Sequence, residues 1–165
     1  MTELERRLAA LEGEHARKTA PGRVPAGGEE LWALARIQEE TAARPDGNGL
    51  VVFAGSVRLP THEQYEWEQH HTTDGLIEED WNDAAEAFAA LGSAVRLRLL
   101  REIIGGRRTA AELTALEGVG TTGQIYHHLR QLSSAGWLHT PGRGRYEVPP
   151  GRVVPLLAAL AAARR

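Results

Sequence analysis

The apolar positions of the first 80 residues change from helical spacing to strand-like spacing. Leu4, Leu8 and Leu11 follow one another at intervals of four and three residues, which predicts an amphipathic helix over residues 2–19. A Pro/Gly-rich linker over 20–28 precedes a second apolar stripe, which predicts a helix over 29–43. The first helix suits either pairing with a second copy or weak docking, because two heptads are too few for a stable coiled coil.

Beyond this helix the pattern becomes typical of strands. An apolar run from Leu50 is followed by Gly55-Ser56 and then by Val57-Arg58-Leu59, which predicts a hairpin with glycine first in a two-residue turn. Aromatic and acidic residues alternate over 65–69, which predicts a third strand. Three strands alone would leave an apolar face in water, so we expect the helix of residues 29–43 to cover it.

From residue 81 the pattern is mainly helical. Acidic residues at its start favour a helix over 81–91, and Ser93 can cap the next helix, which is closed by Gly105-Gly106. Thr109 and Glu112 have the spacing of a capping box at the start of a short helix. The turn that follows contains Gly118 and Gly120, and such a turn lets a helix-turn-helix swing its second helix across the first.

The second helix of this motif is predicted over about 121–133. Its apolar residues Ile125, Leu129 and Leu132 share one face, and polar side chains occupy the other. Residues 137–148 read as two short strands joined by a tight turn, and residues 152–164 as a C-terminal helix. We call the two short strands the wing. A helix with a polar face beside such a hairpin is typical of DNA-binding domains, and the side chains predicted to contact DNA are Thr121, Thr122, Gln124, Tyr126, His127, Arg130, Arg143 and Arg145.

The charge distribution supports a nucleic-acid partner for the second half. The net charge is −3, but residues 1–89 hold 8 Lys or Arg against 18 Asp or Glu, whereas residues 90–165 hold 11 against 4. A basic segment joined to an acidic one is typical of a chain in which one part faces nucleic acid and the other does another job. Chance clustering of solvated charges is the alternative, but a domain that only binds a partner protein would have no need of this basic surplus.

Residues 81–165 resemble the ArsR-like winged helix-turn-helix repressors. Three stretches carry the resemblance, namely residues 90–100, His127-His128-Leu129-Arg130-Gln131-Leu132, and Ala135-Gly136-Trp137-Leu138. The resemblance implies a homodimer whose recognition helices enter successive major grooves of a near-palindromic operator. It also implies that helices at about 81–91 and 152–164 pack into the dimer interface.

The chain departs from that family in three ways. It has no cysteine, so a thiolate metal switch cannot be carried over. Gly123 weakens the recognition helix by about 1 kcal/mol relative to alanine, although it would let the backbone approach DNA closely. Residues 1–80 match nothing in the family, so any small-molecule effector is a candidate for recognition there.

Other functions have weaker support in the sequence. His62, His70 and His71, with nearby carboxylates, could ligate a metal, but their spacing is not diagnostic, and we expect neither a metal nor a cofactor. No nucleophile–base pair, phosphate loop or cofactor fingerprint points to an enzyme. Several aromatic residues could line an effector pocket, although we expect them to form the core of the small sheet. These are Trp32, Phe53, Tyr65, Trp67 and Trp81.

The predicted fold is therefore α+β and mainly α. A winged helix-turn-helix domain over 81–165 follows a small helix-plus-antiparallel-sheet domain over 1–80, which serves in sensing or dimerisation. The predicted function is a sequence-specific, double-stranded-DNA-binding transcriptional regulator, a repressor by its resemblance. The alternative is a protein-interaction module that uses the same fold without DNA. No signal peptide or membrane helix is expected, so the predicted location is the cytoplasm.

Overall fold

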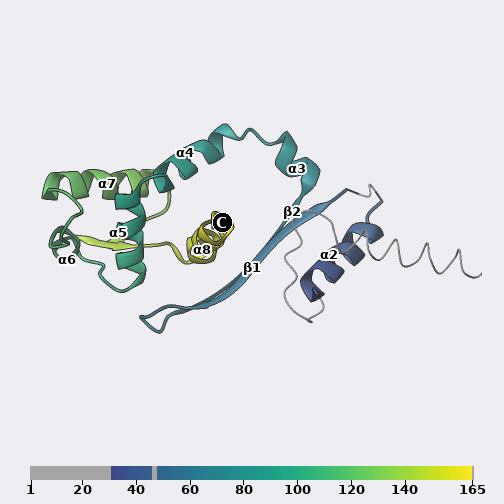
Figure 1. The fold of residues 1–165 in the computed structure, drawn as a ribbon, viewed down its shortest axis with the longest axis horizontal. Helices are drawn as coiled ribbons and strands as arrows, with labels where there is room; N and C mark the ends of the chain where they lie inside the picture. The colour runs from purple at the N-terminus through teal and green to yellow at the C-terminus, as the bar shows by residue number, and fades with distance from the viewer. Residues whose placement is uncertain (1–30, 46–47, 165) are drawn as a thin grey trace, which may run out of the picture. The chain divides into compact units, whose positions relative to one another are not determined.

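The computed structural model describes residues 31–45 and 48–164. The chain divides into two compact units, residues 1–39 and residues 40–165. The described part is α+β and mostly helical, with seven helices and two antiparallel two-stranded sheets (Figure 1). The predicted helix over 2–19 and the linker over 20–28 lie outside the described residues, whereas the second predicted helix is present as α2 (Trp32–Ala43).

The β1–β2 hairpin differs from its prediction. Strand β1 (Leu50–Arg58) runs straight through Gly55-Ser56 and pairs over its full length with β2 (Gln64–Thr72). The predicted two-residue turn and third strand are therefore wrong, because the segment predicted as a third strand belongs to β2, the second strand of this hairpin. The actual turn lies between Arg58 and Gln64, where His62 adopts a left-handed conformation with φ 69°.

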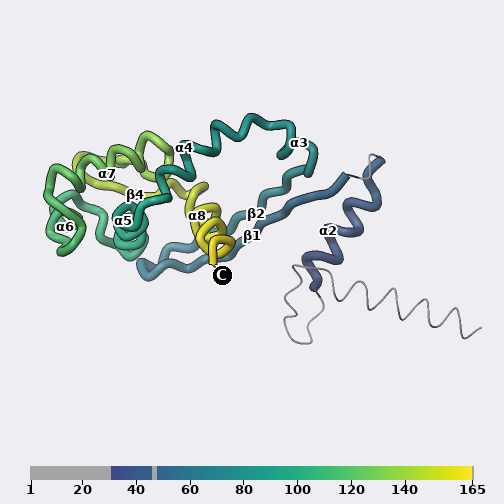
Figure 2. The backbone as a smooth tube through the Cα atoms, turned by 45° about the horizontal axis from the view of Figure 1, so that its top comes forward, coloured from purple at the N-terminus to yellow at the C-terminus, as the bar shows by residue number. Residues whose placement is uncertain are grey.

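Helix α8 (Pro150–Ala162) packs against this hairpin (Figures 1 and 2). A Cβ atom on Gly55 would lie only 2.7 Å from Cγ1 of Val154. The glycine is thus needed in the strand because it lets α8 approach the sheet closely, not because it turns the chain. The helix that the contacts place on the sheet comes from the far end of the chain, which local spacing did not reveal.

Short helices lead from the hairpin into the C-terminal half. Helix α3 (Thr73–Glu78) is capped by Thr72, and α4 (Asn82–Leu91) is followed by α5 (Ala94–Ile104), which Ser93 caps as predicted. Arg96 of α5 joins three elements by donating to the carbonyls of Ala89 and Ala90 and to the amide oxygen of Gln131 at 2.5–2.7 Å. Arg96 therefore holds the end of α4 and helix α7 to α5.

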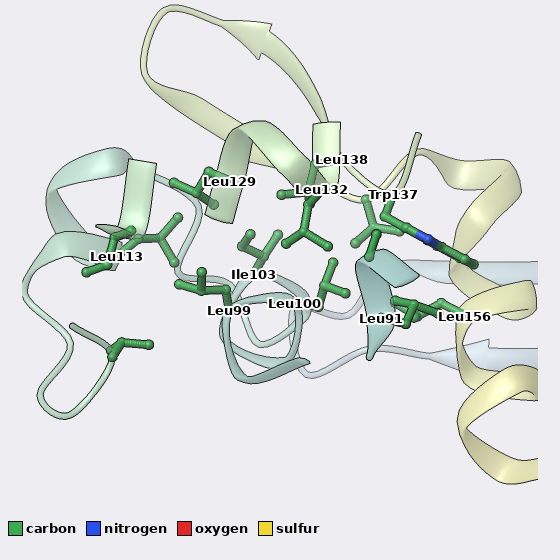
Figure 3. Close-up of a cluster of buried hydrophobic side chains, with 14 of the residues drawn as sticks. Leu91, Leu99, Leu100, Ile103, Leu113, Leu129, Leu132, Trp137, Leu138 and Leu156 are labelled. Carbon is green, nitrogen blue, oxygen red and sulfur yellow. The ribbon is translucent and has the colours of Figure 1, made fainter. Parts of the chain in front are cut away.

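Residues from the remaining elements complete one hydrophobic core. Helices α6 (Ala110–Thr114) and α7 (Thr122–Ser134), strands β3 (His139–Gly142) and β4 (Arg145–Glu147), and α8 follow in chain order. Figure 3 shows the buried side chains in a continuous row, from Leu113 of α6 through Leu100 of α5 and Leu132 of α7 to Leu156 of α8. Leu59 from the β1–β2 turn and Leu156 from α8 are buried in the same cluster. The hairpin and the C-terminal half therefore share a core, while a functional division into 1–80 and 81–165 stays a prediction.

The aromatic residues only partly follow their prediction as core. Phe53 and Tyr65 are half-buried, but Trp81 is 69% exposed and Trp32 is 76% exposed. The indole N–H of Trp81 donates to the carbonyl of Leu76 at 2.7 Å, which fixes the ring beside α3 without burying it. Trp67 is also exposed, at 38%, so the core prediction is wrong for Trp32, Trp67 and Trp81. None of the described helices is long and apolar enough to cross a membrane.

Candidate nucleic-acid interface

Helices α6 and α7 are joined by a tight turn that buries one side chain. Val119 is buried between Gly118 and Gly120, whose φ angles are 71° and 109°. These left-handed conformations strain any residue with a Cβ atom, which explains the two glycines. At Gly120 an added Cβ would also meet the side-chain oxygen of Gln124 at 2.6 Å. The turn directs α7 across α6, and the two helices are in contact.

Helix α7 presents two different faces. Ile125, Leu129 and Leu132 have no solvent exposure and anchor it in the core, as the periodicity predicts. The predicted contact residues on this helix and at its start are all exposed. They are Thr121, Thr122, Gln124, Tyr126, His127 and Arg130. Space is also open in front of Gly123, where an added Cβ would meet no atom within 4 Å.

Two of these exposed residues also build the start of α7. The side-chain oxygen of Gln124 accepts from the N–H of Thr121 at 2.8 Å, and the Thr121 hydroxyl accepts from the N–H of Gln124 at 3.4 Å. This reciprocal capping box satisfies two helix-end donors. The spacing Thr-x-x-Gln signalled it, yet both residues were assigned to DNA contact alone. Four exposed side chains take no part in this capping box and remain candidates for DNA contact alone: Thr122, Tyr126, His127 and Arg130.

The β3–β4 hairpin is extended by a third segment of backbone. The N–H of Tyr146 donates to the carbonyl of Arg108 at 2.7 Å, and the N–H of Ala110 donates to that of Gly144 at 2.8 Å. Thr109 and Arg145 form an isolated antiparallel bridge between these bonds. The hairpin is thereby fixed to the start of α6, and Figures 1 and 2 show α6, α7 and the hairpin gathered around α5.

The two arginines of the hairpin have different surroundings. Arg143 is exposed at the tip and forms no ion pair with any residue in the described part of the chain. Arg145 is half-exposed, and its Nε donates to Oε1 of Glu147 at 2.9 Å. The sequence analysis assigned both arginines to DNA contact, but of the two only Arg143 has a guanidinium group that is not paired with a carboxylate of the described residues.

Beneath the hairpin lies an ion-pair network that the sequence did not reveal. Arg108, with only 12% of its side chain exposed, donates to Glu63 through both terminal nitrogens and lies 3.4 Å from Glu147. The hydrogen bonds from Arg108, followed by that from Thr61, lower the pKa of Glu63 to about 2. Glu147 also has a lowered pKa, caused first by its hydrogen bond from Arg145. The network joins the β1–β2 turn to the root of the β3–β4 hairpin.

The pKa of Glu63 predicts an acid-dependent contribution to stability. A carboxylate whose pKa falls from 4.5 in the unfolded chain to about 2 stabilises the fold above pH 4.5 and loses this effect as the pH falls toward 2. Urea unfolding should therefore find Glu63→Gln less stable than the native chain at pH 6, with the gap closing between pH 4.5 and pH 2. Glu66→Gln, on the opposite and exposed face of the hairpin, is the control. If the difference in stability between Glu63→Gln and the native chain were the same at pH 2 as at pH 6, this account would be contradicted.

The histidines of the described part of the chain do not assemble into a metal site. Within residues 31–45 and 48–164, no three histidine or acidic side chains are placed to hold a metal ion. His62 lies in the β1–β2 turn, whereas His70 and His71 lie near the other end of β2 on opposite faces. His70 contacts Glu68, and its Nδ1 lies 3.8 Å from Glu40. His128 is half-buried as predicted, and its Nδ1 has no hydrogen-bond partner within the described residues.

The residues that the sequence analysis missed act across long separations. Glu63 and Arg108 are 45 positions apart, and no local pattern links them. Trp137 donates from its indole to the carbonyl of Ala87, 50 positions away, while Arg152 lies over the same ring at 5.1 Å. Comparison of the chain with protein-family models, with curated protein sequences and with solved structures found no significant match.

Proposed function

We propose that residues 81–165 form a winged helix-turn-helix domain that binds double-stranded DNA and regulates transcription. In this proposal α6 and α7 are the helix-turn-helix, α7 is the recognition helix, and β3–β4 is the wing. The observation that carries it is the division of α7 into a fully buried apolar face and an exposed polar face beside a glycine-bearing turn. A helix so anchored can enter a major groove without unfolding.

Three further observations support DNA as the partner. The wing tip carries Arg143 with an uncommitted charge, and Arg130 is exposed on α7. The open space before Gly123 lets a phosphate approach the N–H groups at the start of α7, where the helix dipole is positive. Residues 90–165 carry an excess of 7 positive charges, from 11 Lys or Arg against 4 Asp or Glu. Non-specific DNA affinity depends on such a surplus.

We propose further that the protein acts as a homodimer. The resemblance to ArsR-like repressors implies an interface made by the helices at both ends of the domain, here α4 and α8. Exposed apolar side chains on these helices support the assignment, since Phe88 of α4 is 65% exposed and Leu160 of α8 is 38% exposed. A dimer would present two copies of α7 to successive major grooves, about 34 Å apart.

The testing experiment is fluorescence anisotropy of the full chain with DNA from its own upstream region and with a scrambled duplex, at two salt concentrations. Tighter binding to the upstream DNA, weakened by salt, is the expected result. Absence of binding to both duplexes at low salt, by a chain that circular dichroism shows to be folded, would reject the proposal. That outcome would favour the protein-interaction module.

Sequence discrimination should depend on His127. This side chain is exposed on α7 and has no part in the capping box. His127→Ala should reduce the preference for upstream over scrambled DNA by about 1–3 kcal/mol, the usual value of a base contact. Gln124→Ala should reduce the same preference, and unlike His127→Ala it should lower the thermal stability as well, because it removes half of the capping box. An equal loss of affinity for both duplexes in His127→Ala would contradict a base contact.

A further inference from the structure

A pocket of about 520 Å³ lies between α4, α8 and strand β1, away from the proposed DNA contacts. Its lining is largely apolar and includes Phe53, Ala84, Phe88, Trp137, Pro155 and Ala159. The short alanine side chains on both helices leave the space that larger residues would fill. Pockets of 300–1,000 Å³ with apolar walls and few polar groups are typical of small-molecule sites.

The pocket holds one strong anion-binding group. Arg152, in the first turn of α8, lines the pocket and stacks over Trp137 with 5.1 Å between the guanidinium carbon and the ring centroid. No carboxylate of the described residues forms an ion pair with it. The ring is itself held by the indole hydrogen bond to Ala87 of α4 at 2.9 Å. A positioned arginine at the positive end of a helix dipole favours a negative ligand group.

We propose that this pocket binds a small molecule with an apolar body and one anionic group. The apolar body lies between the alanine-rich faces of α4 and α8, and the anion contacts Arg152. Asp83 also lines the pocket, one helical turn before Ala87. Its negative charge would repel a ligand with several anionic groups, so the pocket favours a ligand with a single, localised anion. None of the predicted DNA contacts lines the pocket, so the proposal does not depend on DNA binding, but it requires that a dimer interface leave Phe88 and the space beside it open.

The test titrates the full chain with two fluorescent dyes of the same skeleton. Anilinonaphthalene sulfonate carries the anion, and N-phenyl-1-naphthylamine lacks it. We expect one dye per chain and at least 10-fold tighter binding of the sulfonate. Arg152→Met, which keeps an apolar stem, should remove this preference and leave the affinity for the neutral dye. Arg164→Met, an exposed arginine outside the pocket lining, is its matched control and should change neither affinity.

Two variants that fill the pocket test its location. Ala159→Phe should weaken both dyes at least 10-fold, and Ala162→Phe, at a more exposed lining position, repeats the test if the first variant does not fold. Ala161→Phe, exposed and outside the lining, should bind as the native chain does. Unchanged dye binding in both filled variants, or no binding to the native chain, would overturn the proposal. Equal affinity for the two dyes would overturn the anionic class. Loss of dye as the protein concentration rises would also overturn the proposal, because a second copy of the chain, and not a small molecule, would then occupy the pocket.

Discussion

Replacement of Gly55 by valine should destabilise the chain by about 1–3 kcal/mol, the usual cost of overpacking a well-packed contact. The new Cβ would lie 2.7 Å from Cγ1 of Val154, which is itself buried in the contact between α8 and the hairpin. Neither partner can yield easily, because one belongs to a paired strand and the other to a helix anchored by Leu156. Urea unfolding followed by circular dichroism measures the change.

The neighbouring residue provides a matched control for strand propensity. Ser56 is exposed on the opposite face of β1, so Ser56→Val adds the same side chain without meeting α8. Because valine favours strands, this variant should be as stable as the native chain or slightly more stable. If Gly55→Val were equally well tolerated, the close approach of α8 would not be what requires glycine here.

A double-mutant cycle isolates the contact itself. Gly55→Ala places only one carbon against Val154, and Val154→Ala removes the atom that it meets. The double variant should be more stable than the sum of the two single changes predicts, since each change compensates for the other. Strict additivity would mean that the two residues do not limit each other.

Local signals in the sequence predicted the C-terminal half well. The Ser93 cap, the Thr109–Glu112 capping box and the apolar face of α7 all involve residues within a few positions of one another. Such patterns can be recognised in a sequence because helix periodicity and capping depend on residues that are neighbours in the chain. The same locality explains why the exposed face of α7 could be assigned from spacing alone.

The errors arose where distant residues decide the structure. Gly55-Ser56 has the composition of a tight turn, but both residues are paired with β2 in the middle of β1. The glycine is required there because α8, almost 100 positions later in the chain, packs closely against it. Arg145 is a different case, because its partner Glu147 is only two positions away; the long-range part of its surroundings is Arg108, which lies 3.4 Å from Glu147. The pocket depends likewise on α4, α8 and β1, three segments that no periodicity connects.

The second large effect concerns DNA binding. Reversal of two exposed charges, Arg130→Glu with Arg143→Glu, should weaken binding to upstream DNA at least about 100-fold, because each charge-assisted hydrogen bond to a phosphate contributes about 1.5–3 kcal/mol. The slope of log affinity against log salt should fall by about 1.8, since each lost phosphate contact removes about 0.9. Arg130 lies on the exposed face of α7 and Arg143 at the wing tip, so neither change should disturb the core.

A control with the same change in net charge separates a local contact from a general electrostatic effect. Arg58→Glu with Arg164→Glu alters two exposed arginines outside α7 and the wing, one at the end of β1 and one just beyond α8. This variant should lose little affinity at moderate salt, where charges more than about 10 Å from a phosphate are screened. If both double variants lost affinity equally, net charge alone would account for binding, and α7 would not be the element that contacts DNA. Retained affinity in the α7 and wing variant would exclude that surface directly.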